Sequence, residues 1–310
     1  MNTKNIASII AMAFAIMLLG CVKEDLSICH KDGNASSYLT FEYTMNSDYV
    51  DKFADAVSTL DVFVFDDNLD FISVISSEEK SLKAENYKMM LELPDGTYTF
   101  VVWGGARNSY RAYNTEFDIV PLAEGMSGFE RCKLVLNDDQ SFEDTDDLFH
   151  GIARNVRICS KQLSHTHISL IKNTNNINVT VTGISGQENN NRIDIICSAA
   201  NSEYRFDNSV KNKDLLKQYI SVKTVGENEI NARFKTLRLL TGMKSHLIVR
   251  DADSGLNIIE HNLIDLIKLL PDIRTDEDLD RNDVYNIEID LHTDMSASVI
   301  INGYKVISSN

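Results

Sequence analysis

The sequence predicts an all-β protein of two β-sandwich domains in tandem, behind a cleaved lipoprotein signal peptide. Short segments rich in β-branched and aromatic residues follow one another closely, and turn sequences such as Pro94-Asp95-Gly96 separate them. Helical patterns are few, whereas a parallel α/β sheet needs helices between its strands. Without its leader the chain keeps 290 of its 310 residues, which favours two hydrophobic cores over one.

Residues 1–20 have the pattern of a bacterial lipoprotein signal peptide. Lys4 supplies a positive charge, an apolar run covers residues 6–19, and Gly20 precedes Cys21. The four residues 18–21, Leu-Leu-Gly-Cys, fit the lipobox. This pattern predicts cleavage between Gly20 and Cys21, a thioether-linked diacylglyceryl group on Cys21, and acylation of the new N-terminus.

A transmembrane helix is the alternative for this apolar run. The run has about 14 residues, fewer than the roughly 20 that a spanning helix needs, and Glu24 and Asp25 follow it closely. We therefore expect a lipid anchor, which with two or three acyl chains is durable. Residues 21–36 are polar and are expected to form the lipidated tether.

Residues 37–162 are expected to form the N-terminal β-sandwich domain. Residues 48–57 contain the one helical pattern of this part, with Tyr49, Val50, Phe53 and Val57 on one face. Residues 137–147 are acidic and turn-like. The strand-like segments are residues 38–43, 60–65, 71–75, 87–93, 97–103 and 131–136.

Residues 163–310 are expected to form the C-terminal β-sandwich domain. Its one clear helix covers residues 263–270 and ends before Pro271. The expected strands are residues 165–171, 177–182, 192–197, 230–240, 246–249, 256–261, 285–291 and 298–307. Short strands at close spacing are typical of sandwich folds.

The charge of the chain argues against nucleic acid as a partner. The net charge is −16, and the leader carries one lysine and no acid, so that the mature chain has −17. Such a chain repels nucleic acid and anionic lipid headgroups. Membrane contact is therefore expected through the lipid alone.

Four cysteines remain beside the lipidated one: Cys29, Cys132, Cys159 and Cys197. An even number in an exported protein allows two disulfides with three connectivities, or none. Cys132 and Cys197 lie in strand-like apolar runs and suit buried free thiols equally well. If a disulfide forms, we favour Cys29 with Cys132, which would tie the tether to the first domain.

The sequence contains no catalytic motif of the hydrolase, P-loop, dinucleotide or zinc-protease kinds, and we expect neither an enzyme nor a cofactor. His165 and His167 share a strand face and could bind a metal with a third ligand, but an ordinary exposed face is expected. The acidic residues 276–283 fail the EF-hand pattern, because Arg281 and Ile287 occupy its discriminating positions. We expect solvated acidic loops there and at residues 138–147, with a weak calcium site of another kind as the alternative at either place, and we expect Trp103 in the core.

Several segments in a fixed order resemble the FimB-type fimbrial anchor lipoproteins of Bacteroidetes, which belong to type V fimbriae. They extend over nearly the whole mature chain, so that their order and spacing are more specific than any one of them. Tyr304 stands where the family would have tryptophan. The matching segments are residues 21–29, 62–66, 93–98, 102–105, 148–151, 170–175, 283–287 and 301–307.

The resemblance implies that the two sandwiches are transthyretin-like. It also implies an outer-membrane lipoprotein, with Glu24 and Asp25 as the signal for its surface exposure, that holds the base of a fimbria and limits its length. The implied partners are fimbrial subunits, either fimbrillins or accessory tip and shaft proteins. A surface glycan-binding lipoprotein is the alternative, and it predicts exposed aromatic platforms.

Fimbrial subunits of this kind polymerise when a strand of one subunit enters a sheet of the next. An edge strand offers unpaired backbone groups for such addition. Residues 298–307 are the candidate polymerisation strand, with Val299, Ile301, Tyr304 and Val306 along it. The alternative is an ordinary internal strand of the second domain.

Overall fold

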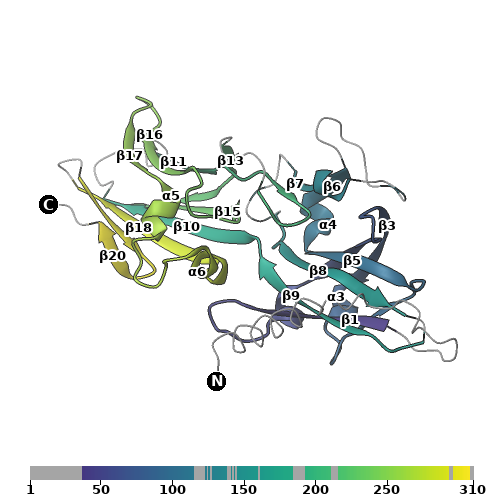
Figure 1. Ribbon diagram of the computed structural model, residues 1–310. Helices are drawn as coiled ribbons and strands as arrows, with labels where there is room; N and C mark the ends of the chain where they lie inside the picture. The colour runs from purple at the N-terminus through teal and green to yellow at the C-terminus, as the bar shows by residue number, and fades with distance from the viewer. Residues whose placement is uncertain are drawn as a thin grey trace, which may run out of the picture.

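The computed structural model describes residues 37–114, 128–137, 145–159, 161–183, 193–210, 216–292 and 296–307, together with positions 123, 125, 141 and 143. Within these ranges the fold is all-β, as the sequence predicts. The strands form sheets of seven, six, four and three strands, and the two sandwiches lie along the long axis of the molecule (Figure 1).

The first sandwich is built from the seven-stranded sheet. Its strand order is β3-β2-β5-β8-β9-β1-β4. β8 and β9 pair only at Phe149↔Lys172 and His150↔Ile171, and there the sheet folds over. The part with β2, β5 and β8 and the part with β9, β1 and β4 therefore enclose one hydrophobic core. The strands are β1 (Ser37–Met45), β2 (Thr59–Phe65), β3 (Phe71–Glu78), β4 (Met89–Leu91), β5 (Gly96–Gly104), β8 (Phe149–Ile158) and β9 (His165–Lys172).

The central strands β2 and β5 are buried on both faces. Val62 and Val102 point into the core of the first sandwich. Phe63 and Trp103 point to the opposite side, into a second core that also contains the buried side chains of the second sandwich. Strands covered on both faces have nearly continuous apolar sequences, which explains the runs at residues 60–65 and 97–103. Trp103 is fully buried, as predicted.

The second sandwich packs a six-stranded sheet against a four-stranded sheet. The first has the order β14-β15-β10-β18-β19-β20 and the second β13-β11-β16-β17. The strands are β10 (Thr174–Thr182), β11 (Ile193–Ala199), β13 (Lys217–Tyr219), β14 (Val222–Val225), β15 (Ile230–Leu237), β16 (Ser245–Asp251), β17 (Asn257–His261), β18 (Val284–Leu291), β19 (Ala297–Ile301) and β20 (Tyr304–Ile307).

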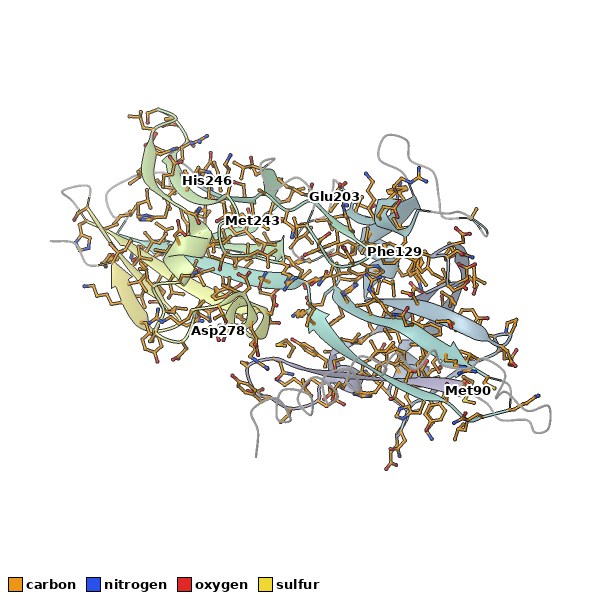
Figure 2. All side chains as sticks on the ribbon, viewed as in Figure 1. Met90, Phe129, Glu203, Met243, His246 and Asp278 are labelled. Carbon is orange, nitrogen blue, oxygen red and sulfur yellow. The ribbon has the colours of Figure 1, made fainter. Side chains whose placement is uncertain are left out.

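A small sheet links the two sandwiches. β6 (Tyr110–Asn114) and β7 (Cys132–Leu136) come from the first half of the chain, and β12 (Glu203–Arg205) comes from the second. Lys133 of β7 and Glu203 of β12 form an ion pair at 3.3 Å. Side chains fill the space around this sheet, where Phe129 and Glu203 lie (Figure 2).

β9 belongs to the first sandwich, although the expected division after residue 162 assigned it to the second. It pairs in parallel with β1 from Tyr38↔His165 to Met45↔Ile171. An isolated strand-like segment carries no signal of the sheet that it joins, which is why this assignment was wrong. The chain passes between the sandwiches at Asn173, between β9 and β10, and we propose to draw the division there.

The helices are short and differ in part from the expected ones. In the predicted segment 48–57 only α2 (Phe53–Ala56) is helical, because Tyr49 has a left-handed backbone with φ 57° and lies exposed. The predicted helix 263–270 is present as α5 (Leu263–Ile267). The remaining helices are α3 (Glu79–Leu82), α4 (Ala106–Ser109), the 3-10 turn η2 (Phe129–Arg131) and α6 (Asp276–Arg281).

The acidic run after residue 275 is helix α6 rather than the expected loop. Thr275 caps the helix by accepting a hydrogen bond from the Asp278 amide, and the Asp278 carboxylate accepts one from the Thr275 amide. This reciprocal capping box satisfies two backbone donors. No helix within the described ranges is both long and apolar enough to cross a membrane.

Candidate assembly site

β20 is the edge strand at the C-terminal end of the six-stranded sheet. It forms a hairpin with β19, in which Ile301 faces Tyr304 across the two-residue turn Asn302-Gly303. Both turn residues have positive φ, 48° and 83°, as in the I′ turn that suits a tight hairpin. Asn302 also fixes the turn to β18, because its amide N–H donates to the Asn286 carbonyl oxygen at 2.9 Å.

The four residues of the candidate polymerisation strand divide between these two strands. Val299 and Ile301 belong to β19, which pairs with strands on both sides, and their side chains are 1% and 0% exposed in the core. Tyr304 and Val306 belong to β20, where Tyr304 is 51% exposed. β19 is thus an internal strand, and the candidate narrows to β20.

The outer edge of β20 is open to further pairing within the described part of the chain, where β20 is the last strand of its sheet. Val306 forms a β-bulge in this strand. Val299 pairs with Ile307 and Ile300 pairs with Lys305, so Val306 has no partner on β19. Such bulges and a nearby lysine are common devices that keep an edge from pairing indiscriminately.

β20 and the start of β1 lie at opposite ends of the molecule. β1, to which the tether leads, lies in the first sandwich at the right of Figure 1, and β20 lies at the far left. The registers give the direction of β20: Ile307 faces Val299, which faces Ile289, which faces Val181 at the far end of β10. The chain therefore leaves β20 heading away from the first sandwich.

The cysteines do not form the pair that we favoured. Cys132 is a free thiol on β7 and is fully buried, and its Sγ contacts the Gly128 carbonyl oxygen at 3.8 Å. A Cys29–Cys132 disulfide is thus wrong, because Cys132 fills the core between the sandwiches. Burial raises the pKa of the Cys132 thiol to about 12. Cys197 is likewise free and buried, whereas Cys159 is disulfide-bonded. Gly20, Cys21 and Cys29 lie outside the described residues.

A cluster of charged side chains, of which Lys172 is buried and the others are half-buried, joins the two sandwiches. Lys172, the last residue of β9, forms ion pairs with Asp147 at 2.8 Å and with Asp283 just before β18. Lys235 of β15 completes the cluster at 2.9 Å from Asp147. Burial alone would lower the pKa of the Lys172 ammonium, but the two carboxylates outweigh it and raise that pKa. The first sandwich is thus bound electrostatically to the second.

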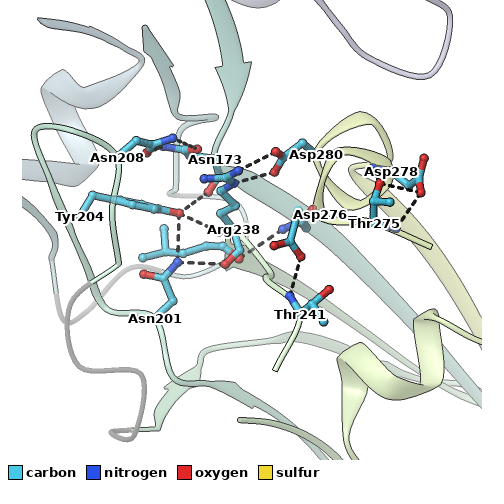
Figure 3. Close-up of polar contacts among 12 residues, drawn as sticks. Asn173, Asn201, Tyr204, Asn208, Arg238, Thr241, Thr275, Asp276, Asp278 and Asp280 are labelled. Atoms are coloured by element: carbon cyan, nitrogen blue, oxygen red, sulfur yellow. Dashed lines mark hydrogen bonds and ion pairs between the residues drawn. The ribbon is translucent and has the colours of Figure 1, made fainter. Parts of the chain in front are cut away.

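Beside these charges lies a hydrogen-bonded network around Tyr204 (Figure 3). The Tyr204 hydroxyl donates to the Asn173 carbonyl oxygen at 2.8 Å and accepts from the Arg238 amide at 2.7 Å. The Arg238 guanidinium donates to both carboxylate oxygens of Asp280 at 2.6 Å. Asn173, fully buried at the passage between the sandwiches, pairs its side chain with that of Asn208.

An aromatic cluster completes the junction. Trp103 packs edge to face against His150 with 4.6 Å between ring centroids, and it also contacts Phe206. His150 Nε2 donates to the Phe206 carbonyl oxygen at 2.9 Å. Because apolar packing, charges and hydrogen bonds all cross the junction, we expect the two sandwiches to move as one body.

Apart from the core position of Trp103, the roles of these junction residues were not predicted from the sequence. Asp147 was counted within a solvated acidic run, although it is paired with two lysines. Lys172 and Asn173 carried a usable signal, since a charge and an amide directly after an apolar strand are unusual unless they have partners. Asp280 had no such signal in the sequence, because its partner Arg238 lies 42 residues away.

Comparison with known proteins identifies the family. The model for the fimbrillin-A associated anchor proteins Mfa1 and Mfa2 matches residues 30–310. No curated protein is similar enough to the chain to count as a match.

Solved structures support the same fold. The fimbrial anchor protein Mfa2 from Porphyromonas gingivalis is similar at 21% identity and a TM-score of 0.69, with 89% of this chain and 99% of that chain covered. A proposed polysaccharide-binding protein from Bacteroides thetaiotaomicron has 24% identity and a TM-score of 0.75 over 87% of this chain and 97% of that chain. A proposed adhesin from Bacteroides ovatus has 20% identity and a TM-score of 0.78 over 90% and 96%. Because the family model matches residues 30–310 of its 310 residues, this chain belongs to the fimbrillin-A associated anchor proteins.

Proposed function

We propose that the chain is the structural anchor subunit of a fimbria, held in the outer membrane by the lipid on Cys21. In this proposal β20 joins the neighbouring fimbrial subunit by strand addition, and the anchor limits the length of the fimbria. A subunit whose N-terminus is fixed by lipid cannot pass that end outward, so it occupies one end of the polymer. The partners are fimbrillins or accessory subunits of the same fimbria.

The observation that carries this proposal is the position of β20 relative to β1. The tether enters the first sandwich at β1, and the open edge of β20 lies at the other end of the molecule (Figure 1). The junction of charges, hydrogen bonds and aromatic rings connects the two ends. A load on the fimbria would therefore pass through both sandwiches to the tether.

Crosslinking from β20 tests the strand-addition part of the proposal. A photoreactive residue in place of Tyr304 is expected to give one main adduct with a fimbrial subunit in native membranes, because Tyr304 is 51% exposed on the open edge. Tyr49, which is 68% exposed on the first sandwich, is the matched control and should give none. Equal adducts from both positions, or none from Tyr304, would contradict the role of β20.

We also propose that a disulfide between Cys29 and Cys159 links the tether covalently to the first sandwich. Cys159 is disulfide-bonded, Cys132 and Cys197 are free, and Cys21 is assigned to the lipid, which leaves Cys29. The Tyr38 amide donates to the Ser164 carbonyl oxygen at 3.0 Å, so β1 begins beside the loop that follows Cys159. The eight residues from Cys29 to Ser37 can extend about 26 Å, enough for this connection.

Peptide mapping under non-reducing conditions is expected to recover a peptide pair that links Cys29 and Cys159. The thiols of Cys132 and Cys197 should be alkylated only after unfolding, because both are buried. A bridge from Cys159 to any other cysteine would show that the tether is not held in this way.

Glycan binding remains the alternative function, since a structure of similar fold is described as a proposed polysaccharide-binding protein. The single tryptophan, Trp103, is fully buried and offers no stacking platform. The anchor function is therefore better supported.

A further inference from the structure

The outer face of the first sandwich carries a histidine pair that the anchor function does not use. β1 and β9 run in parallel, with Tyr38 beside His165, Thr40 beside His167 and Glu42 beside Ser169. The alternate residues of both strands point into the core, so these six side chains share the outer face. The two histidines are exposed.

Both histidine rings converge on one atom. The Thr40 Oγ1 lies 2.7 Å from His165 Nε2 and 2.9 Å from His167 Nδ1. A hydroxyl has a single proton and can donate to only one of the two nitrogens. The two imidazole nitrogens are therefore directed at the same small volume, which a hydroxyl group fills.

The second nitrogen of His167 has a carboxylate partner. His167 Nε2 lies 3.3 Å from Glu42 Oε2, and the Ser169 hydroxyl donates to Glu42 Oε1 at 2.6 Å. An ionised carboxylate only accepts hydrogen bonds, so His167 donates from Nε2, and in the neutral imidazole the lone pair of Nδ1 is then directed toward Thr40. A carboxylate behind a histidine is the arrangement that orients histidine ligands of metals and raises their basicity.

In the sequence these two histidines have no evident third ligand for a metal. The structure supplies Glu42 and Thr40 from β1, more than a hundred residues away in the sequence. Among the described residues no group of three or more His, Cys, Asp and Glu side chains is arranged around one ion. A metal here would thus have two histidine ligands and open positions for water.

We propose that His165 and His167 bind a divalent transition-metal ion through His165 Nε2 and His167 Nδ1, with Glu42 orienting His167. Imidazole ligands suit Zn²⁺, Ni²⁺ and Cu²⁺, whereas Ca²⁺ and Mg²⁺ prefer oxygen ligands. The ion replaces the two hydrogen bonds of Thr40, and His165 carries its proton on Nδ1 when Nε2 binds the metal. The net charge of −16 attracts cations to the protein in general.

Titration of the full-length chain with Zn²⁺ and Ni²⁺ at neutral pH, followed by calorimetry, tests this proposal. One ion per chain is expected, and the His165→Gln and His167→Gln variants should each lose this binding. Glu42→Gln keeps both ligands and should weaken binding about tenfold, as is usual when the orienting partner of a ligand is removed. Thermal unfolding without metal checks that the variants are folded.

His246→Gln is the matched control. His246 Nδ1 also lies beside a carboxylate, 3.2 Å from Glu260 Oε1, but no contact among the described residues brings a second histidine to it. His246 lies on β16 of the second sandwich. It is far from Met90 on β4, the strand that pairs with β1 beside the histidine pair (Figure 2). Unchanged Zn²⁺ binding in His246→Gln together with loss in His167→Gln is the expected result. Equal binding in the wild type and in the His165→Gln, His167→Gln double variant, or no binding by the wild type, would overturn the proposal.

Discussion

Replacing Asp280 with alanine is expected to lower the free energy of unfolding by about 3–5 kcal/mol, the usual cost of breaking a buried ion pair. Asp280 accepts two hydrogen bonds from the Arg238 guanidinium at 2.6 Å, and both side chains are largely buried. Burial raises the pKa of the Asp280 carboxyl, and the hydrogen bonds and positive charge of Arg238 oppose this rise. Without Asp280 the Arg238 charge remains buried and uncompensated.

Glu277→Ala is the matched control for this measurement. Glu277 lies on the same helix, α6, and pairs with Arg281 at 2.9 Å, but its side chain is 61% exposed. Its loss should cost less than about 1 kcal/mol. The double variant Asp280→Leu, Arg238→Met should recover much of the loss, because it removes both charges. Urea unfolding measures all three, and an equal cost for Asp280→Ala and Glu277→Ala would contradict the buried-pair interpretation.

Acidification from pH 6.5 to pH 4 is expected to destabilise the protein by about 3 kcal/mol through His150 alone. Burial lowers the pKa of the His150 imidazole to about 4, although its hydrogen bond to the Phe206 carbonyl opposes this shift. Between these pH values the unfolded chain binds a proton that the folded chain excludes, so stability falls with pH. Well above pH 6.5, the pKa of His150 in the unfolded chain, both states are neutral at this group, and its contribution is constant.

His150→Gln should flatten this part of the pH profile, because it removes the group that titrates there. Unfolding can be followed by the fluorescence of Trp103, the single tryptophan, whose ring lies 4.6 Å from that of His150. A profile with the same slope in wild type and His150→Gln would show that His150 does not titrate in this range.

The sequence was sufficient for the local elements that depend on local chemistry. The alternation in β1 and β18 and the turn at Pro94-Asp95-Gly96 predict strands that the structure contains. The lack of helical patterns predicted the all-β class for the same reason. Each of these signals lies within a few neighbouring residues.

The misplaced parts depend on contacts between distant residues. β9 joins β1 across 127 residues, as in the pairing of Thr40 with His167, and nothing in its own sequence specifies that neighbour. Cys132 fitted a disulfide and a buried thiol equally well, and only its position between the sandwiches decides between them. The capping box at Thr275 was a local signal for helix α6, but the surrounding acidic residues led us to expect a loop.

Retention of fimbriae by a Cys21→Ala variant tests whether the lipid on Cys21 holds the fimbria on the cell. Cells that produce this variant in place of the wild type are compared for the share of fimbriae on the cell and in the medium, and for fimbrial length. We expect a folded variant that lacks the lipid, fimbriae released into the medium, and altered length control. Fimbriae of normal length that stay attached to the cell would contradict the role of this chain as the lipid-held anchor.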